Sequence, residues 1–257
     1  MSAAKEIVSE PDIKTLAIIA GGGDLPPRLA QICRAQGMDV FIVALDGHTD
    51  PAWLDGYDHA VFKLGQLGKM IKSLETRRIK DLVMIGSVTR PSFKDLIPDL
   101  KGAAFLARYG GRAMGDDDLL SALKAMLGDE GFIVHGVHRF IADILAPKGG
   151  LGVHNPTNDD WVDIRRGVDV ARGLGALDVG QAVVVQEGIV LGVEAAEGTD
   201  ALIKRCAALK RGGQRGGQRG ARGGVLVKLC KPQQDKDLDL PTIGPQTVQN
   251  AIDAGLA

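Results

Sequence analysis

Short aliphatic runs alternate with amphipathic segments through the first half of the chain, and this alternation restricts the fold more than any other feature. Residues 16–20, 40–45 and 82–85 are continuous apolar runs, as expected of strands that are buried on both faces. Residues 26–36 and 66–77, which lie between these runs, carry apolar side chains at helical spacing. The order strand, helix, strand, helix, strand predicts a parallel sheet with helices on its faces.

The rest of the first half extends this pattern and then ends it. Helices are predicted at 92–109 and 116–127, and a strand that returns to the sheet is predicted at 132–137. Gly and Pro then crowd residues 147–156, where no apolar periodicity continues. We therefore predict a Rossmann-like domain over residues 1–146, followed by an interdomain linker that acts as a hinge.

The second half has a different pattern. β-Branched runs at 181–186 and 189–194 flank the dipeptide Glu187-Gly188, which is a hairpin signal. The other predicted elements are a strand at 225–229 and helices at 160–174, 199–209 and 247–254. The predicted fold class is α/β, with an N-terminal Rossmann-like parallel-sheet domain and a smaller α+β C-terminal domain over residues 157–257.

Composition excludes several classes of protein. Of the 257 residues, 45% are hydrophobic and 25% are charged, which is ordinary for a folded globular chain. The three Cys and five His are scattered, so neither a disulfide framework nor a zinc site is expected. No run approaches the roughly 18 apolar residues of a membrane span. The N-terminal segment carries acids and lacks the apolar stretch of a signal peptide, so we expect a cytoplasmic protein.

A glycine turn follows the first predicted strand and precedes the first predicted helix. Gly21, Gly22, Gly23 and Asp24 thus stand where phosphates or a nucleotide bind, because glycine lets the backbone approach an anion and helix N–H groups point at it. The match to the dinucleotide pattern G-x-G-x-x-G is partial, since Pro26 stands at the third glycine. A mononucleotide or nucleotide-sugar site, a dinucleotide site and a tight turn capped by Asp24 all stay open.

Two further segments carry polar residues at the ends of predicted elements. Ser87, Thr89 and Arg90 follow a predicted strand, and loops at the carboxyl ends of parallel strands form the ligand crevice of such sheets. Their hydroxyls and guanidinium suit phosphate, although a plain polar loop is the alternative. Asp116 and Asp117 begin a helix, where they either interact with its dipole or hold a metal or a ribose hydroxyl.

Carboxylates gather after the predicted hairpin. Glu194, Glu197 and Asp200 fall at the end of a strand, in a turn and at a helix start. Converging carboxylates bind hard divalent cations such as Mg²⁺ or Mn²⁺. Ordinary acidic capping of the helix is the alternative.

Lysines and an aspartate lie together around the strand predicted at 225–229. Lys228 and Lys231 can neutralise phosphate oxygens while Asp235 holds a metal or activates water, so we name all three as catalytic candidates. The wider segment 204–231 holds nine Lys or Arg and no acid, in a chain of net charge −1. Phosphate, on a substrate or on an anionic membrane, is the natural partner of such a segment. Its glycine–arginine stretch has no aromatic side chain to stack on bases.

Five motifs, in this order, are similar to those of the LpxI family of UDP-2,3-diacylglucosamine pyrophosphatases in lipid A biosynthesis. They are IAGGGDLP (19–26), GSVTRP (86–91), GDDDLL (115–120), VVVQEGIVLGVEAAEGTDALIKR (183–205) and KPQQDKDLDLPTIGPQTV (231–248). The resemblance implies a metal-dependent enzyme that hydrolyses the substrate's diphosphate to UMP and 2,3-diacylglucosamine 1-phosphate (lipid X). It also implies two domains that both contact the substrate, and action at the cytoplasmic face of the inner membrane.

The matched motifs complete the set of candidate residues. Metal binding, with Mg²⁺ or Mn²⁺, is assigned to Asp235, Glu194 and Asp200. One position departs from the family pattern, because Asp237 stands where the family commonly has Arg. Substrate contacts are assigned to Gly21, Gly22, Gly23, Asp24, Ser87, Thr89, Arg90, Asp116, Asp117, Gln186, Glu197, Thr199, Gln234 and Thr242.

Two other classes of function stay open. An NAD(P)-dependent oxidoreductase would use the glycine turn, and a non-enzymatic RNA- or membrane-binding adaptor would use segment 204–231. For the hydrolase we expect the nucleotide-sugar lipid and lipid X as small-molecule partners, peripheral association with an anionic inner-membrane surface, and no nucleic acid. The sequence is compatible with a homodimer.

Overall fold

A computed structural model describes residues 13–89, 98–109, 116–141, 144–209 and 223–256 of the chain. These residues divide into two compact units. The first takes in the described part of Met1–Ala146 together with Lys236–Leu238, and the second takes in that of Pro147–Asp235 and Asp239–Ala257. Each unit has its own sheet and its own apolar clusters.

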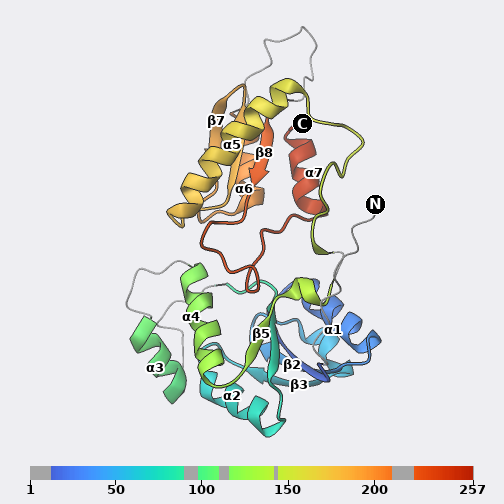
Figure 1. Ribbon diagram of the computed structural model, residues 1–257, viewed down its shortest axis with the longest axis vertical. Coiled ribbons are helices and arrows are strands. Elements are labelled where there is room, and N and C mark those ends of the chain that lie inside the picture. The colour runs from blue at the N-terminus through green and yellow to red at the C-terminus, as the bar shows by residue number, and fades with distance from the viewer. Residues whose placement is uncertain (1–12, 90–97, 110–115, 142–143, 210–222, 257) are drawn as a thin grey trace, which may run out of the picture. The chain divides into compact units, whose positions relative to one another are not determined.

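The first unit is built on a five-stranded parallel sheet with the order β3-β2-β1-β4-β5 (Figure 1). The chain moves outward through β2 and β3 and then returns to the other side of β1 for β4 and β5. This order creates a topological switch point between β1 and β4, the place where ligands bind in open α/β sheets. The strands are β1 (Thr15–Ala20), β2 (Asp39–Leu45), β3 (Asp58–Phe62), β4 (Asp81–Ile85) and β5 (Ile133–His135).

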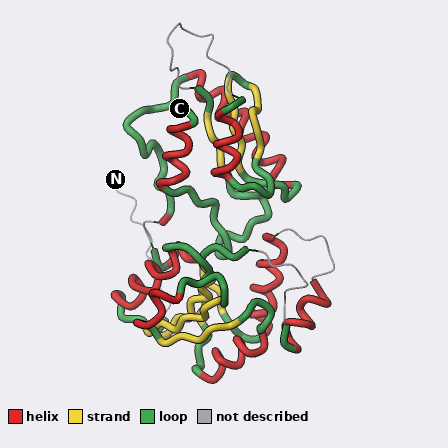
Figure 2. The backbone as a smooth tube through the Cα atoms, turned by 180° about the vertical axis from the view of Figure 1, so that it is seen from behind, coloured by secondary structure: helices red, strands yellow, loops and turns green. Residues whose placement is uncertain are grey.

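Helices cover both faces of this sheet, because alternate residues of its central strand β1 face opposite ways. Leu16 and Ile18 pack in a cluster with residues of α1 (Leu25–Ala35), whereas Ala17 and Ile19 pack in a cluster with residues of α2 and α4. Figure 2 shows the strands in yellow with helices around them. The remaining elements are η1 (Pro51–Gly56), α2 (Leu67–Thr76), α3 (Leu100–Tyr109), α4 (Asp116–Asp129) and η2 (Val137–Arg139).

The second unit has three layers around a small antiparallel sheet of order β7-β6-β8. Val183 and Val185 of the central strand pack in a cluster with residues of α5, and Ala182 and Val184 pack with residues of α6 and of the segment around α7. The core is therefore aliphatic, in keeping with a chain in which only 4% of the residues are aromatic. The elements are α5 (Asn158–Ala176), β6 (Ala182–Gln186), β7 (Ile189–Val193), α6 (Thr199–Ala207), β8 (Val225–Lys228) and α7 (Pro245–Asp253).

The β6–β7 hairpin turns at Glu187 and Gly188, which both have positive φ (52° and 76°). Positive φ at both central residues is the geometry of a two-residue hairpin turn, and it explains the glycine. The buried carboxylate of Asp163, on α5, accepts hydrogen bonds from the amides of Glu187 (3.0 Å) and Gly188 (2.6 Å). Helix α5 and the hairpin are thereby joined by a polar contact as well as by their apolar faces.

The predicted fold class is confirmed: the chain is α/β, with a parallel-sheet unit and a smaller α+β unit. The sequence analysis missed β3, a short strand at the sheet edge in which only the last residue, Phe62, is buried. Its residues therefore lack a continuous apolar run. Helix α3 begins at Leu100, after Pro98 and Asp99, and the first part of the helix predicted at 92–109 lies outside the described residues.

Residues 147–156 contain no helix or strand and their side chains are exposed, and their role as a hinge stays a prediction. None of the described helices combines the length and the apolar character that crossing a membrane requires.

Candidate functional site

The glycine turn and the loop after β4 pair with each other at the switch point of the first unit. The amide of Gly21 donates to the carbonyl of Ile85 (2.8 Å), and the amide of Gly22 donates to the carbonyl of Ser87 (2.8 Å). The amide of Ser87 donates back to the carbonyl of Gly22 (3.0 Å). The structure thus brings two of the predicted candidate segments together.

This pairing supplies a reason for having glycine at these positions that the sequence analysis did not predict. A Cβ atom on Gly21 would lie 2.6 Å from the carbonyl oxygen of Ser87, and one on Gly86, where φ is +101°, would lie 2.8 Å from the carbonyl carbon of Gly21. The amides of Gly21 and Gly22 donate to the carbonyls of Ile85, the last residue of β4, and of Ser87, and the binding of an anion at this turn stays a prediction. Close approach of the two loops is what requires glycine here.

The remaining candidates of the first unit differ in how they are placed. Gly23 (φ +90°) and Asp24 are exposed, and Asp24 stands at the N-cap of α1 without a side-chain capping bond. Ser87 and Thr89 are exposed on the neighbouring loop. Arg90 lies outside the described residues, as do the side chains of Asp116 and Asp117, although both aspartates begin α4 as predicted.

In the second unit, four predicted residues form a connected polar group, which we call the Lys228 cluster: Glu194, Thr199, Lys228 and Thr242. The buried carboxylate of Glu194 accepts a hydrogen bond from the hydroxyl of Thr199 (Oγ1–Oε1, 2.5 Å). The ammonium of Lys228 donates to the same hydroxyl (2.9 Å) and to the carbonyl of Thr242 (2.9 Å). The other oxygen of Glu194 accepts from the amide of Gln181 (3.1 Å).

The antiparallel register explains why these residues meet. Ala182 of the central strand β6 pairs with Lys228 on one side, and its carbonyl accepts from the amide of Glu194 on the other. Residues 34 positions apart in sequence are thus neighbours across one strand, and Thr199 reaches both of them from the first turn of α6. Lys228 is the last residue of β8 and Glu194 directly follows β7, so both lie at the same end of the sheet.

Gln186 does not join this cluster. It lies at the other end of β6, paired with Ile189 at the hairpin, and a four-residue separation along a strand is about 13 Å. Its buried side chain instead lies against Gly223 and Gly224. A motif match could not show that Gln186 lies away from the Lys228 cluster, because a motif does not indicate which end of a strand lies near that cluster.

Two carboxylates near the cluster have different environments. Glu197 accepts hydrogen bonds from Arg205 (2.8 Å) and from the amide of Ala195 (3.1 Å), and the guanidinium of Arg205 holds the pKa of the Glu197 carboxyl below its usual range. Asp200 has a buried oxygen, Oδ1, with no hydrogen-bond partner among the described residues. An unpaired buried carboxylate oxygen is costly, so it is a natural position for a cation.

The loop after β8 is shaped by Gln234. The side-chain oxygen of this buried residue accepts from the amide of Lys231 (3.1 Å) and from the thiol of Cys230 (3.2 Å), and its Nε2 donates to Asp239 (2.7 Å). Asp235, the next residue, is half-buried. Gln234 therefore has a role in holding the loop that carries the catalytic candidate Asp235.

Lys231 forms an ion pair that the sequence analysis did not predict, and its catalytic role stays a prediction. Its ammonium forms an ion pair with the carboxylate of Asp178 (2.6 Å), and this lysine side chain is only 13% exposed. The pair ties the loop to the segment just after α5. Asp178 was not a candidate, since a single Asp after a predicted helix carries no signal of its own.

The carboxylate donors were tested for their fit to a divalent cation. Among the residues that the structure describes, no group of three or more His, Cys, Asp and Glu is arranged around one point. Mg²⁺ is, however, commonly held by one or two carboxylates together with substrate phosphates and water. The unpaired oxygen of Asp200 and the carboxylate of Asp235 fit that kind of site in their chemistry, whereas both oxygens of Glu194 already accept hydrogen bonds.

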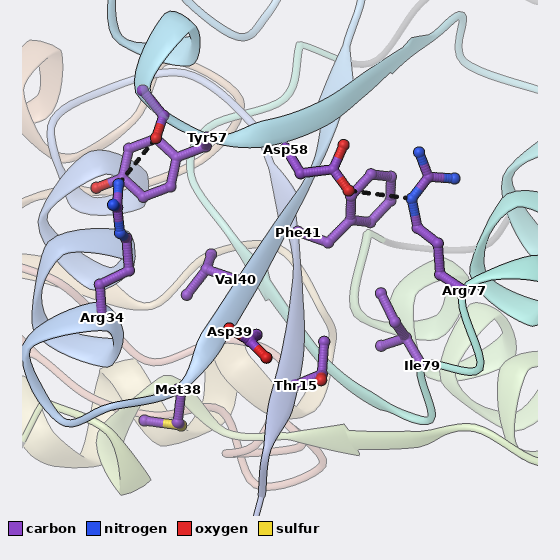
Figure 3. Close-up of a pocket in the computed structure, with 11 residues that line it drawn as sticks. Thr15, Arg34, Met38, Asp39, Val40, Phe41, Tyr57, Asp58, Arg77 and Ile79 are labelled. Carbon is purple, nitrogen blue, oxygen red and sulfur yellow. Dashed lines mark hydrogen bonds and ion pairs between the residues drawn. The ribbon is translucent and has the colours of Figure 1, made fainter.

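A groove of about 460 Å³ lies at the opposite ends of the first unit's strands (Figure 3). It is lined by the first residues of three strands, Thr15, Asp39 and Asp58. Arg77 pairs with Asp58 (3.3 Å) and stacks over the ring of Phe41, 4.2 Å from its centre. The groove is thus at the amino ends of the strands, away from the glycine turn, and it does not belong to the candidate site.

Comparisons with known proteins agree with the motifs. A family described as the LpxI N-terminal domain matches residues 15–144, and one described as the LpxI C-terminal domain matches residues 147–257. The UDP-2,3-diacylglucosamine pyrophosphatase LpxI of Caulobacter vibrioides is 41% identical over 246 residues, which are 95% of this chain and 87% of that protein. The crystal structure of the Bordetella bronchiseptica enzyme WbmG in complex with NAD aligns with a TM-score of 0.31 and 12% identity, over 48% of this chain and 37% of that one. The latter similarity is too weak to support a conclusion.

Proposed function

The chain belongs to the LpxI family, and from this premise we propose that it hydrolyses the diphosphate of UDP-2,3-diacylglucosamine to UMP and 2,3-diacylglucosamine 1-phosphate. In this reaction water attacks one phosphorus, and the bridging oxygen leaves with the other. The observation that carries the proposal is the 41% identity to a UDP-2,3-diacylglucosamine pyrophosphatase over 95% of the chain.

The Lys228 cluster supports a role in binding the negative charge of the diphosphate. An ammonium has three N–H donors, and the described residues supply acceptors for two of those of Lys228, at Thr199 and Thr242. The third can reach a phosphate oxygen. The Glu194 carboxylate orients the Thr199 hydroxyl, so that the oxygen lone pairs of this hydroxyl face Lys228.

The proposed metal is Mg²⁺ or Mn²⁺. Asp235, Glu194 and Asp200 would hold it: Oδ1 of Asp200 has no hydrogen-bond partner among the described residues, and each oxygen of Glu194 accepts one hydrogen bond and keeps a second lone pair. Such an ion, when bound, withdraws charge from the diphosphate oxygens. Asp235 is proposed in addition to orient or deprotonate the attacking water.

The switch-point loops are proposed to receive the nucleotide or its phosphates. Gly23, Asp24, Ser87 and Thr89 are exposed there, on the two loops that pair with each other. Arg90, Asp116 and Asp117 remain part of this proposal on the strength of their motifs alone.

The proposal includes a peripheral position at the cytoplasmic face of the inner membrane. Its support is the nine cations and no acid of segment 204–231, which would be attracted to anionic lipid. Most of the glycine–arginine stretch within that segment lies outside the described residues.

The deciding experiment measures UMP release from detergent-dispersed UDP-2,3-diacylglucosamine, before and after EDTA and after Mg²⁺ or Mn²⁺ is added back. We expect release that EDTA abolishes and either ion restores. No release in the presence of both ions would reject the hydrolase. Full release after exhaustive chelation would keep the hydrolase and reject the metal. Hydride transfer with NAD(P) that survives chelation would favour the oxidoreductase instead.

A further inference from the structure

Three residues of the loop after β8 belong to a different unit from their neighbours. Lys236–Leu238 are counted with the first unit, whereas Asp235 on one side and Asp239 on the other are counted with the second. Leu238 packs against the apolar cluster that α2 and α4 form with the sheet of the first unit. The tripeptide directly after the catalytic candidate Asp235 therefore has its own binding place in the first unit.

Within it, the carboxylate of Asp237 lies in a small site formed by Lys124, Gly136 and His138, which we call the seat of Asp237. Lys124, on α4, lies 3.4 Å from one carboxylate oxygen, and Nε2 of His138, on η2, lies 3.9 Å from the other. Gly136 packs closely against both side chains. A Cβ atom at this position would come within 2.7 Å of Asp237 Oδ1 and would also collide with the ring of His138. Two separate parts of the first unit, α4 and the segment 136–138 at η2, thus converge on one side chain.

The His138 ring also has a nitrogen without a hydrogen-bond partner. Nδ1 of His138 is buried and makes no hydrogen bond to any described residue. The ring lies against Gly136 on one side, and its other nitrogen faces Asp237.

We infer that Asp237 is a positioning residue for the hydrolysis, and that its seat on Lys124, His138 and Gly136 fixes where Asp235 stands. This inference rests on the proposed function, since its readout is the rate of UMP release. Asp237 acts through the backbone, not on the substrate.

The chain geometry makes this coupling tight. Two peptide units separate Asp235 from Asp237, so their Cα atoms are at most about 7 Å apart. The amide of Asp239 donates to the carbonyl of Asp235 (3.1 Å), which closes the chain across the seated tripeptide. A shift of the tripeptide is therefore passed to Asp235, and misplacement of a catalytic group by about 1 Å can cost up to about 10²-fold in rate.

The test compares Asp237→Asn and Lys124→Gln with wild type in the full chain, in the UMP-release assay with Mg²⁺. Both variants keep the size of the side chain and remove its charge. We expect kcat to fall by about tenfold or more in each, with KM within about threefold. The double variant should be no slower than the slower single variant, because both substitutions break the same contact.

A charge-reversed pair separates positioning from direct action. Asp237→Lys and Lys124→Asp should each be slow alone, and the two together should recover most of the lost kcat. The control is Glu130→Gln, which breaks another lysine–carboxylate pair of the first unit (Lys101–Glu130, 2.5 Å) and should leave both constants unchanged.

Each contrary result is decisive. Wild-type kcat in Asp237→Asn, or a fall in the double variant equal to the product of the two single effects, would overturn the inference. A charge-reversed double variant that stays as slow as the two single variants would also overturn the inference, because Asp237 would then act directly on the substrate. If wild type itself releases no UMP, the proposed function fails and the inference fails with it, whereas an active wild type together with an equally active Asp237→Asn rejects the inference alone.

Discussion

At the scale of single residues, the hydroxyl of Thr199 is the centre of the Lys228 cluster, since it donates to Glu194 and accepts from Lys228. Thr199 is buried, so no water replaces these contacts readily. The charges of Glu194 and Lys228 are linked through this one oxygen atom. The sequence marked all three residues, but the linking role of the threonine is visible only in the structure.

Thr199→Val keeps the shape of the side chain and removes that oxygen. We expect it to lower the free energy of unfolding by about 1–3 kcal/mol, because the buried Oε1 atom of Glu194 loses the hydrogen bond from Thr199. Urea unfolding at neutral pH measures this. Thr242→Val is the matched control, since Lys228 contacts the carbonyl of Thr242 and not its hydroxyl, and it should change stability much less.

Asp235→Ala tests the central catalytic assignment. The variant should fold and bind substrate, and it should lose kcat for UMP release by about 10²-fold or more, the scale of a lost catalytic group. Asp253→Ala removes an exposed carboxylate from the end of α7 and serves as control. Near-normal turnover in a folded Asp235→Ala protein would rule out the role.

At the scale of secondary-structure elements, aspartate carboxylates join elements that lie apart in sequence. Asp163 connects α5 to the β6–β7 hairpin, and Asp99 connects the first turns of α2 and α3. In each case a side chain satisfies amides that the secondary structure leaves unpaired.

Replacing Asp163 with Ala leaves the amides of Glu187 and Gly188 without their acceptor. A buried hydrogen bond to a charged group contributes about 1.5–3 kcal/mol, so we expect a loss of at least about 2 kcal/mol in the free energy of unfolding. Chemical denaturation is the measurement. Asp169→Ala, at an exposed position of the same helix, should have little effect, and equal losses in both variants would show that the turn contact is unimportant.

Asp99 makes stability depend on pH. Burial would raise the pKa of its carboxyl, but hydrogen bonds from the amides of Gly102, Lys69 and Gly68 outweigh burial and hold the pKa below its usual range. A pKa that is lower in the folded state means that the stabilisation is complete above the unfolded-state pKa, about 3.9, and is lost as the pH falls through the folded-state value.

The prediction for Asp99→Asn follows from that sign. At pH 7 the variant should be less stable than wild type, and the difference should shrink as the pH is lowered from 5 toward 3. Urea unfolding of both proteins across this range measures it. A difference that is constant with pH would mean that the charge of Asp99 contributes nothing.

At the scale of the whole molecule, the proposed substrate is a lipid, and none of the described helices is able to cross a membrane. The arginines at 211, 215, 219 and 222 lie outside the described residues, and their composition is the basis for this prediction. We expect salt-sensitive binding to anionic vesicles that weakens when all four become Ser, at roughly 1 kcal/mol for each cation near the surface.

Vesicle sedimentation at low and high salt is the measurement, with activity on detergent-dispersed substrate expected to change little. The control replaces Arg165, Arg166 and Arg172, which are exposed on α5, with Ser. If the four-Ser protein binds vesicles as well as wild type at low salt, the segment has no role in membrane association.

The sequence alone determined what depends on short-range pattern. Apolar runs and helical spacing located most strands and helices, and Glu187-Gly188 located the hairpin, because the side-chain period and the turn residues act within a few positions of the chain. The short edge strand β3 escaped for the same reason, since an edge strand needs no continuous apolar run. The motifs likewise marked Glu194, Thr199 and Asp235, and the charge pattern around the strand predicted at 225–229 marked Lys228.

Only the tertiary structure decided which of these residues meet. It turned Gly21 and Gly22 toward the Ser87 loop, placed Gln186 at the far end of β6, and brought Lys124 to Asp237 across 113 positions of the chain. Such contacts depend on strand register and on loop closure, for which the local sequence carries no signal. The residue types therefore determine which chemical groups are available, and the packing of the chain determines where these groups come together.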